Sequence, residues 1–165
     1  ETENIDSMNC LIDWLPKNLP SEKRTGIVHG DYSLTNVMIG KNDPNVIAIL
    51  DWELSTLGDP CADFNYHCLQ YIMNPKLADK DYCRNQGIPV IDEYVKMYSE
   101  KINVDLTEEW DLYSAYNLFK LAGILQGILG RVRDGTAAHE NAAERASGVR
   151  NLSDKAWDLV KKNFL

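Results

Sequence analysis

The fold is decided by two neighbouring stretches of sequence. Residues 27–36 read Ile-Val-His-Gly-Asp-Tyr-Ser-Leu-Thr-Asn, and residues 46–53 read Val-Ile-Ala-Ile-Leu-Asp-Trp-Glu. The first stretch contains the pattern His-x-Asp-x-x-x-x-Asn, and the second is a short apolar run that ends at an acid, Asp51. Each stretch therefore combines a short predicted strand with oxygen-bearing side chains directly beside or after it.

The residues between these stretches predict an antiparallel hairpin. Residues 37–39 are apolar, and residues 40–45 are a dense cluster of turn-forming residues. Two apolar runs separated by such a cluster are typical of paired strands, which lie about 4.8 Å apart. We therefore expect the hairpin to bring Asp51 back beside the loop that holds Asp31 and Asn36, so that three oxygen-bearing side chains converge.

Length and composition indicate one ordinary globular domain over residues 1–165. Acidic residues outnumber basic ones by 25 to 17 and no basic run stands out, which argues against nucleic-acid binding. No apolar run is long enough to span a membrane, and the first residues lack a signal-peptide pattern. The four cysteines form no Cys-x-x-Cys pair, which favours reduced, mostly buried thiols. We therefore expect an intracellular, cytoplasmic protein.

Most of the remaining chain has helical periodicity. Pro16 is expected to end the first helix, Asp59 to cap the second, and Thr107 to cap the longest. Apolar residues surround nearly the whole circumference of the longest helix, which predicts that it is central and buried. The segments 54–60 and 74–89 are rich in turn residues and are expected to be irregular. The expected helices are 5–15, 60–73, 90–102, 108–133 and one from near Ala138 to Asn163. The predicted fold class is α+β, mostly α.

The three converging side chains suit phosphoryl transfer. This reaction needs a group that orients the attacking hydroxyl and divalent metal ions that neutralise phosphate charge. Asp31 can accept the proton of the hydroxyl. Asn36 and Asp51 supply the hard oxygen ligands that Mg²⁺ prefers.

The same residues match a family pattern. The run from His29 to Asn36, followed by Asp51, resembles the catalytic loop and metal-binding Asp of the kinase fold. Gly30 stands where protein kinases carry Arg, and Trp-Glu replaces Phe-Gly after Asp51. These choices, and the short segment up to Pro60, resemble the aminoglycoside phosphotransferase and choline kinase-like family, which phosphorylates hydroxyls of small molecules.

The resemblance extends over nearly the whole chain. Residues 46–63 and 118–130 are similar to the phosphotransferase modules fused to, or related to, acyl-CoA dehydrogenase-like proteins. The resemblance implies the C-terminal lobe of a protein-kinase-like fold, with the small hairpin carrying the catalytic loop. It also implies an enzyme, a small-molecule O-phosphotransferase that uses ATP and Mg²⁺.

Site roles follow from this resemblance. Asp31 is expected to be the general base, and His29 to fix the loop around it through hydrogen bonds. Asn36 and Asp51 are expected to hold the metal ion and, through it, ATP.

Two further acids are expected near the site. Asp63 matches a structural acid of the family that ties a helix start to the catalytic loop. Glu53 is a candidate ligand for metal or substrate, because it follows Asp51 by two residues.

The nucleotide-covering lobe of the kinase fold has no counterpart in these residues. No Gly-x-Gly-x-x-Gly run and no Val-Ala-x-Lys strand precede residue 27. We therefore expect this lobe elsewhere in a longer chain, and little or no activity from residues 1–165 alone. The expected partners are a nucleotide and a small hydroxyl-bearing acceptor.

Two other functions compete with phosphoryl transfer. A degenerate kinase-like module would bind a ligand or partner without transfer, although such a site is expected to lose at least one of the three side chains. A metal-dependent phosphoester hydrolase would use the same acids, but the chain has few His residues and few paired acids.

Overall fold

The computed structural model describes residues 3–19, 24–137 and 141–165. The chain divides into two compact units, Glu1–Pro20 with Asp111–Leu165, and Ser21–Trp110. Helices dominate both units, and two small sheets of two strands each complete the fold, as the α+β prediction required.

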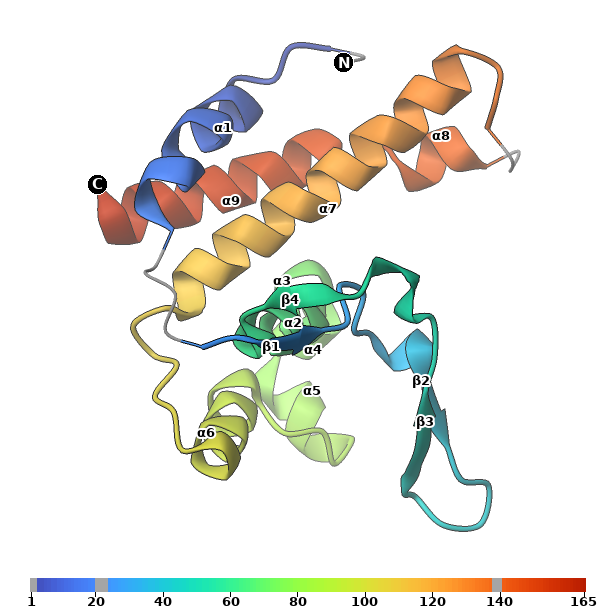
Figure 1. Ribbon diagram of the computed structural model, residues 1–165, viewed down its shortest axis with the longest axis vertical. Coiled ribbons are helices and arrows are strands. Elements are labelled where there is room, and N and C mark those ends of the chain that lie inside the picture. Colours follow the sequence, from blue (N-terminus) through green and yellow to red (C-terminus); the bar gives the residue numbers. More distant parts are fainter. Residues whose placement is uncertain (1–2, 20–23, 138–140) are drawn as a thin grey trace. The chain divides into compact units, whose positions relative to one another are not determined.

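The first unit is helical. Helices α1 (Asp6–Asn18) and α9 (Val149–Phe164) lie side by side in Figure 1, because their apolar faces pack together. Ser7 and Ser153 share a buried hydrogen bond of 2.9 Å between their Oγ atoms. The unit also contains the long helix α7 (Trp110–Arg133) and the short helix α8 (Ala142–Arg145).

The second unit carries both sheets. Its strands are β1 (Gly26–Val28), β2 (Val37–Ile39), β3 (Val46–Ile49) and β4 (Thr56–Gly58), with 3₁₀ turns η1 (Leu34–Asn36) and η2 (Trp52–Leu54) between them. Its helices are α2 (Pro60–Cys68), α3 (Gln70–Met73), α4 (Pro75–Ala78), α5 (Lys80–Asn85) and α6 (Ile91–Ile102). Helix α2 contacts β1, which pairs with β4.

The predicted hairpin is present. Strands β2 and β3 pair antiparallel, with Val37 opposite Ile49, and form the arm labelled in Figure 1. The pairing continues past the strands, because the Leu50 N–H donates to the Asn36 carbonyl over 2.8 Å. Asn36 and Asp51 therefore lie at the same end of the hairpin.

Several expected boundaries were wrong. Helix α1 continues through Pro16 to Asn18, whose side-chain amide donates to the Trp14 carbonyl over 2.8 Å and so supports the last turn. The segment 54–60 contains β4, because residues far back in the chain supply its pairing partner, β1. The segment 74–89 contains α4 and α5, since the Asn74 and Asp79 side chains accept from the first backbone N–H groups of these helices.

Helix α7 also differs from its prediction. It begins at Trp110, because Thr107 lies in a preceding turn where its backbone N–H donates to the Asp105 carboxylate over 2.9 Å. Its fully buried residues all lie between Leu112 and Ala122, so only its first half is a central helix. The expected start of the last helix near Ala138 falls outside the described residues.

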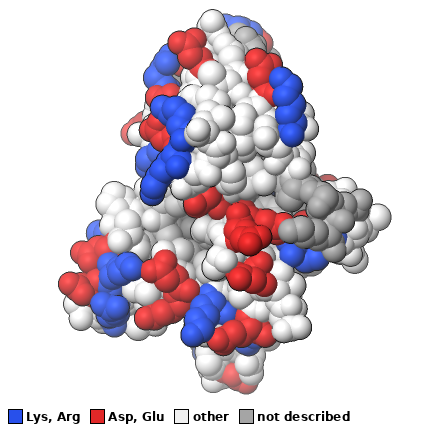
Figure 2. Space-filling model, turned by 90° about the vertical axis from the view of Figure 1, so that its left-hand side faces the viewer, with Lys and Arg blue, Asp and Glu red and all other residues white. Residues whose placement is uncertain are grey.

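The cysteines and the charged surface residues lie as the sequence predicted. Cys61, Cys68 and Cys83 are buried free thiols and Cys10 is half-buried, as predicted. On the face drawn in Figure 2, acidic and basic side chains lie interspersed among uncharged ones. Within the described ranges, no helix is both long and apolar enough to cross a membrane.

Candidate functional site

The candidate site begins where β1 ends. The chain leaves β1 at Val28 and enters the loop that starts with His29 and Gly30. The His29 ring is buried, with 2% of its surface exposed, and packs against the Trp52 ring at 4.7 Å between centroids. A buried imidazole must satisfy both ring nitrogens with hydrogen bonds.

Both nitrogens of His29 find partners in the loop. Nε2 lies 2.7 Å from the Leu50 carbonyl oxygen, and Nδ1 lies 3.2 Å from the backbone N–H of Asp31. The Asp31 N–H is a donor and the Leu50 carbonyl an acceptor, so the neutral tautomer with its proton on Nε2 satisfies both. His29 thus joins the loop before Asp31 to the end of β3.

Asp31 and Asn36 are held together. The Asn36 side-chain amide donates to the Asp31 carbonyl over 2.9 Å and to the Asp31 carboxylate over 3.1 Å. This orients the Asn36 amide, and its Oδ1 accepts no hydrogen bond within the described part of the chain. The carboxylate of Asp31 is half-exposed and can reach a bound molecule.

Asp51 lies directly after β3. Its backbone is left-handed, with φ 68° and ψ 54°, a conformation that Asp tolerates better than most residues. The turn projects Asp51 at the end of the hairpin that also holds Asn36, and its side chain is exposed. Glu53 is exposed within η2, so its role as a ligand remains a prediction.

Asn36 and Asp51 carry oxygen atoms of the kind that Mg²⁺ prefers, and their role as its ligands remains a prediction. Among the described residues, no three His, Cys, Asp or Glu side chains gather as a complete metal site. Mg²⁺ is commonly held by one or two carboxylates, with water and phosphate oxygens filling the other positions. One carboxylate and one amide oxygen suit that arrangement, whereas they would not suit a closed structural zinc site.

Helix α2 anchors the loop through Asp63. Its carboxylate accepts the backbone N–H of His29 and, over 3.0 Å, the N–H of Gly30. These bonds give two backbone donors of a buried segment a charged acceptor. Loss of these bonds would free the segment that places Asp31.

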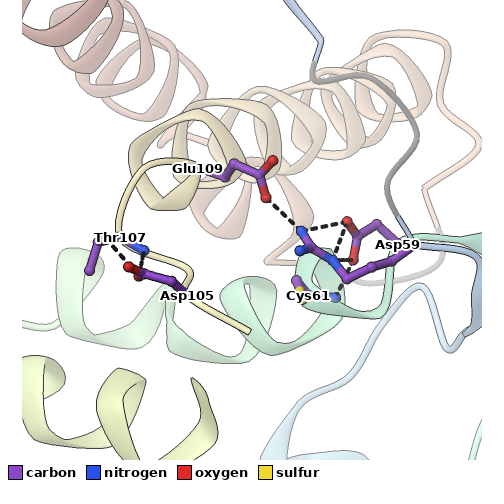
Figure 3. Close-up of polar contacts among 6 residues, drawn as sticks. Asp59, Cys61, Asp105, Thr107 and Glu109 are labelled. Atoms are coloured by element: carbon purple, nitrogen blue, oxygen red, sulfur yellow. Dashed lines mark hydrogen bonds and ion pairs between the residues drawn. The ribbon is translucent and has the colours of Figure 1, made fainter. Parts of the chain in front are cut away.

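A charged cluster fixes the start of α2. Asp59 caps the helix by accepting the Cys61 N–H over 2.9 Å, and the Arg24 guanidinium binds Asp59 at 2.9 Å and Glu109 at 2.5 Å (Figure 3). Glu109 is 9% exposed at its side chain, so most of its charge is removed from water. Burial, with Asp59 nearby, raises the pKa of the Cys61 thiol to about 12, which keeps it a thiol at neutral pH.

Replacing Arg24 with methionine is expected to destabilise the protein by roughly 3 kcal/mol, because two largely buried carboxylates lose their counter-charge. Urea unfolding followed by tryptophan fluorescence measures the change. Arg84→Met is the matched control, since the Arg84–Asp81 pair is exposed and should contribute well under about 1 kcal/mol. Equal losses for the two variants would contradict the structural role of Arg24.

Gly30 is required by backbone geometry. Its φ of 85° is left-handed, and a Cβ atom at this position would lie 2.5 Å from the Leu54 carbonyl oxygen. Both the conformation and the close approach therefore exclude a larger side chain.

Gly30→Ala is expected to cost roughly 3 kcal/mol of stability, because the new methyl group must displace η2 as well as adopt a strained φ. Gly87→Ala is the control, because Gly87 also has a positive φ of 68° but has no atom within 4 Å of its added Cβ. That variant should lose only about 1 kcal/mol. Unfolding free energies measured by urea titration would contradict this account if they were the same for both.

Tyr66 lies near the site but was not predicted from the sequence. It lies on α2, one turn after Asp63, and its phenol is near enough to Asp31 to be affected by the charge of that carboxylate. Burial and the Asp31 charge raise the pKa of Tyr66 to about 12, so the phenol remains a donor at neutral pH. The three-residue spacing from Asp63 predicts that the two residues share a face of α2, but it does not predict what that face packs against.

An aromatic cluster adjoins the loop. The His67 ring lies 5.5 Å from the Tyr32 ring, and His67 Nε2 lies 3.2 Å from the Tyr94 hydroxyl. Burial lowers the pKa of His67, so the imidazole is neutral at neutral pH. The cluster is uncharged and includes Tyr32, the residue that follows Asp31 in the loop.

Comparison with known proteins decides the family. The model of the phosphotransferase enzyme family matches residues 2–116, more than half of the chain. The chain belongs to the phosphotransferase enzyme family. A Ralstonia eutropha protein, crystallised and assigned as an aminoglycoside phosphotransferase, is 41% identical, with a TM-score of 0.89 over the whole of this chain and 52% of its own. The chain therefore has the predicted fold, that of the C-terminal lobe of a kinase-like phosphotransferase.

Longer proteins contain a region similar to this chain. Mouse acyl-CoA dehydrogenase family member 10 is 38% identical over 98% of this chain, and human acyl-CoA dehydrogenase family member 11 is 33% identical over 98%. The chain spans only 16% and 21% of the lengths of these relatives. The resemblance to modules of acyl-CoA dehydrogenase-like proteins is therefore confirmed.

Proposed function

We propose that this chain supplies the catalytic lobe of an enzyme that transfers the γ-phosphoryl group of ATP to a hydroxyl of a small molecule. The proposal is supported mainly by the hydrogen bond between the Leu50 N–H and the Asn36 carbonyl, which brings Asp51 close to the catalytic loop. In that loop the Asn36 side-chain amide donates to the Asp31 carboxylate. One group that can take a proton thus lies beside two oxygen ligands for a metal ion.

The proposed reaction assigns a task to each side chain. The Asp31 carboxylate orients the acceptor hydroxyl and takes its proton as the hydroxyl oxygen bonds to the γ-phosphorus. The bond to the bridging oxygen breaks, and ADP leaves with the electron pair. Asn36 and Asp51 would hold Mg²⁺, which when bound neutralises charge on the phosphate oxygens.

The nucleotide-covering lobe is proposed to come from chain beyond these 165 residues, as in the longer relatives. Ile27 and Leu57 are cross-strand partners on β1 and β4, and their side chains are 70% and 73% exposed. Exposed apolar residues that lie together are typical of surfaces covered by another part of a protein. A lobe seated on these strands would bring its phosphate-binding groups toward the loop.

The test is an acceptor screen with the full-length protein, ATP and Mg²⁺. Hydroxyacyl-CoA thioesters are included because of the names of the longer relatives, and aminoglycosides because of the solved neighbour. Amino-alcohols and sugars complete the set. We expect a phosphorylated product that requires an acceptor and disappears in Asp31→Ala; tight ATP binding with no product from any acceptor would favour the binding module instead.

A further inference from the structure

We propose that Trp52 is a positioning residue that fixes the turn from which the Asp51 carboxylate binds a metal ion. The inference rests on the proposed role of Asp51 as a metal ligand. It gives a role at the site to the residue that directly follows Asp51 in the chain.

The Asp51 carboxylate depends on the backbone for its position. Its side chain is exposed and forms no hydrogen bond or ion pair within the described part of the chain. A carboxylate that no other side chain holds is placed by its own backbone and rotamers. The contacts that fix the backbone at Asp51 therefore decide which positions this proposed ligand can reach.

The backbone at Asp51 is unusual. Among the described non-glycine residues, only Asp51 and Asn103 have a positive φ, of 68° and 53°. Asn103 ends helix α6, where a left-handed residue is ordinary. Asp51 instead follows a strand, and such a conformation in a non-glycine residue persists where surrounding contacts hold it.

Contacts on both sides of Asp51 hold the turn. Before it, the Leu50 N–H donates to the Asn36 carbonyl over 2.8 Å. After it, the Trp52 indole N–H reaches back across Asp51 and donates to the Ile49 carbonyl over 2.8 Å. The indole thus closes the turn from the side that the Leu50 contact does not hold.

The same indole joins the turn to the catalytic loop. Its ring packs against the buried His29 ring at 4.7 Å between centroids. Nε2 of His29 lies 2.7 Å from the Leu50 carbonyl oxygen, and Nδ1 accepts the Asp31 N–H. One imidazole therefore supports both the loop of the proposed base and the turn of the proposed metal ligand, and Trp52 is its contact beyond Asp51.

The experiment compares Trp52→Phe with Trp14→Phe in the full-length protein. Trp52→Phe keeps an aromatic ring against His29 and removes the indole N–H, and we expect the fold to tolerate it because Trp52 is 44% exposed. Trp14 is half-buried and packs on Phe164 at 5.5 Å between centroids. Its indole N–H has no hydrogen-bond partner within the described residues, so Trp14→Phe is the matched control.

The readout is the binding of Mn²⁺ in the presence of ADP, measured by electron paramagnetic resonance. Mn²⁺ takes the same oxygen ligands as Mg²⁺. Trp52→Phe should raise the Kd for Mn²⁺ roughly 10-fold, because contacts that orient a metal ligand contribute to metal affinity, and Trp14→Phe should leave it within about twofold. The Mg²⁺ concentration for half-maximal rate should rise in the same proportion, with kcat at saturating Mg²⁺ within about threefold of wild type.

A double variant separates positioning from a general loss of structure. If Trp52 acts through Asp51, adding Trp52→Phe to Asp51→Asn should raise the Kd for Mn²⁺ no further than Asp51→Asn alone. An unchanged Kd in Trp52→Phe, or additive losses in the double variant, would overturn the inference. Mn²⁺ binding that is absent from the wild type, or that does not need Asp51, would also overturn it. If the wild type binds Mn²⁺ but phosphorylates no acceptor, the proposed transfer has failed, and the Kd values still decide the role of Trp52.

Discussion

Asp31→Asn is expected to lower kcat for phosphoryl transfer by about 10³-fold in the full-length protein, because the amide cannot accept the hydroxyl proton. The substitution preserves shape and leaves an oxygen that can still accept the Asn36 amide. Binding of Mg·ATP should therefore change little, and the loss should appear in kcat rather than in the KM for ATP.

The measurement is steady-state kinetics with an acceptor identified by the screen. Asp43→Asn is the matched control, since Asp43 lies exposed in the turn of the same hairpin and contacts the Asn45 amide. It should retain wild-type rates. An Asp31→Asn enzyme within about tenfold of wild type would show that another group accepts the proton.

Asp51→Asn is expected to reduce kcat/KM for Mg·ATP by roughly 10²- to 10³-fold, because a neutral amide replaces the carboxylate that is proposed, together with Asn36, to bind the metal ion. Asn36 alone cannot supply the missing negative charge. Higher Mg²⁺ concentration should recover part of the lost activity, which distinguishes weak metal binding from a misfolded loop.

Mg²⁺ titrations of the initial rate test this prediction. Asp81→Asn is the control, because the Asp81 side chain is 90% exposed and pairs only loosely with Arg84 at 3.7 Å. An unchanged Mg²⁺ dependence in Asp51→Asn would remove Asp51 from the proposed metal site. Circular dichroism of both variants should match the wild type.

The hairpin was predictable because its signals are local. The turn cluster and the apolar runs on either side specify the pairing of β2 with β3, and the pairing places Asp51 near Asn36. Gly30 differs from the hairpin: the sequence identified it as a family feature, but its cause, the close approach of Leu54, is visible only in the structure.

Non-local features were missed for physical reasons. Strand β4 is three residues long and ends in Gly, so its own sequence favours no strand; pairing with β1 makes it one. The short helices α4 and α5 follow Asn74 and Asp79, whose capping contacts resemble turn signals in the sequence. The position of Tyr66 near Asp31 depends on how α2 packs against the loop, which no spacing in the sequence specifies.

The most direct test of transfer to a hydroxyl is to quantify ADP, free phosphate and phosphorylated acceptor in one reaction of the full-length protein with Mg·ATP. The account predicts equal amounts of ADP and phosphorylated acceptor, with little free phosphate. ADP formed together with an equal amount of free phosphate, and no phosphorylated acceptor, would contradict it and show hydrolysis instead.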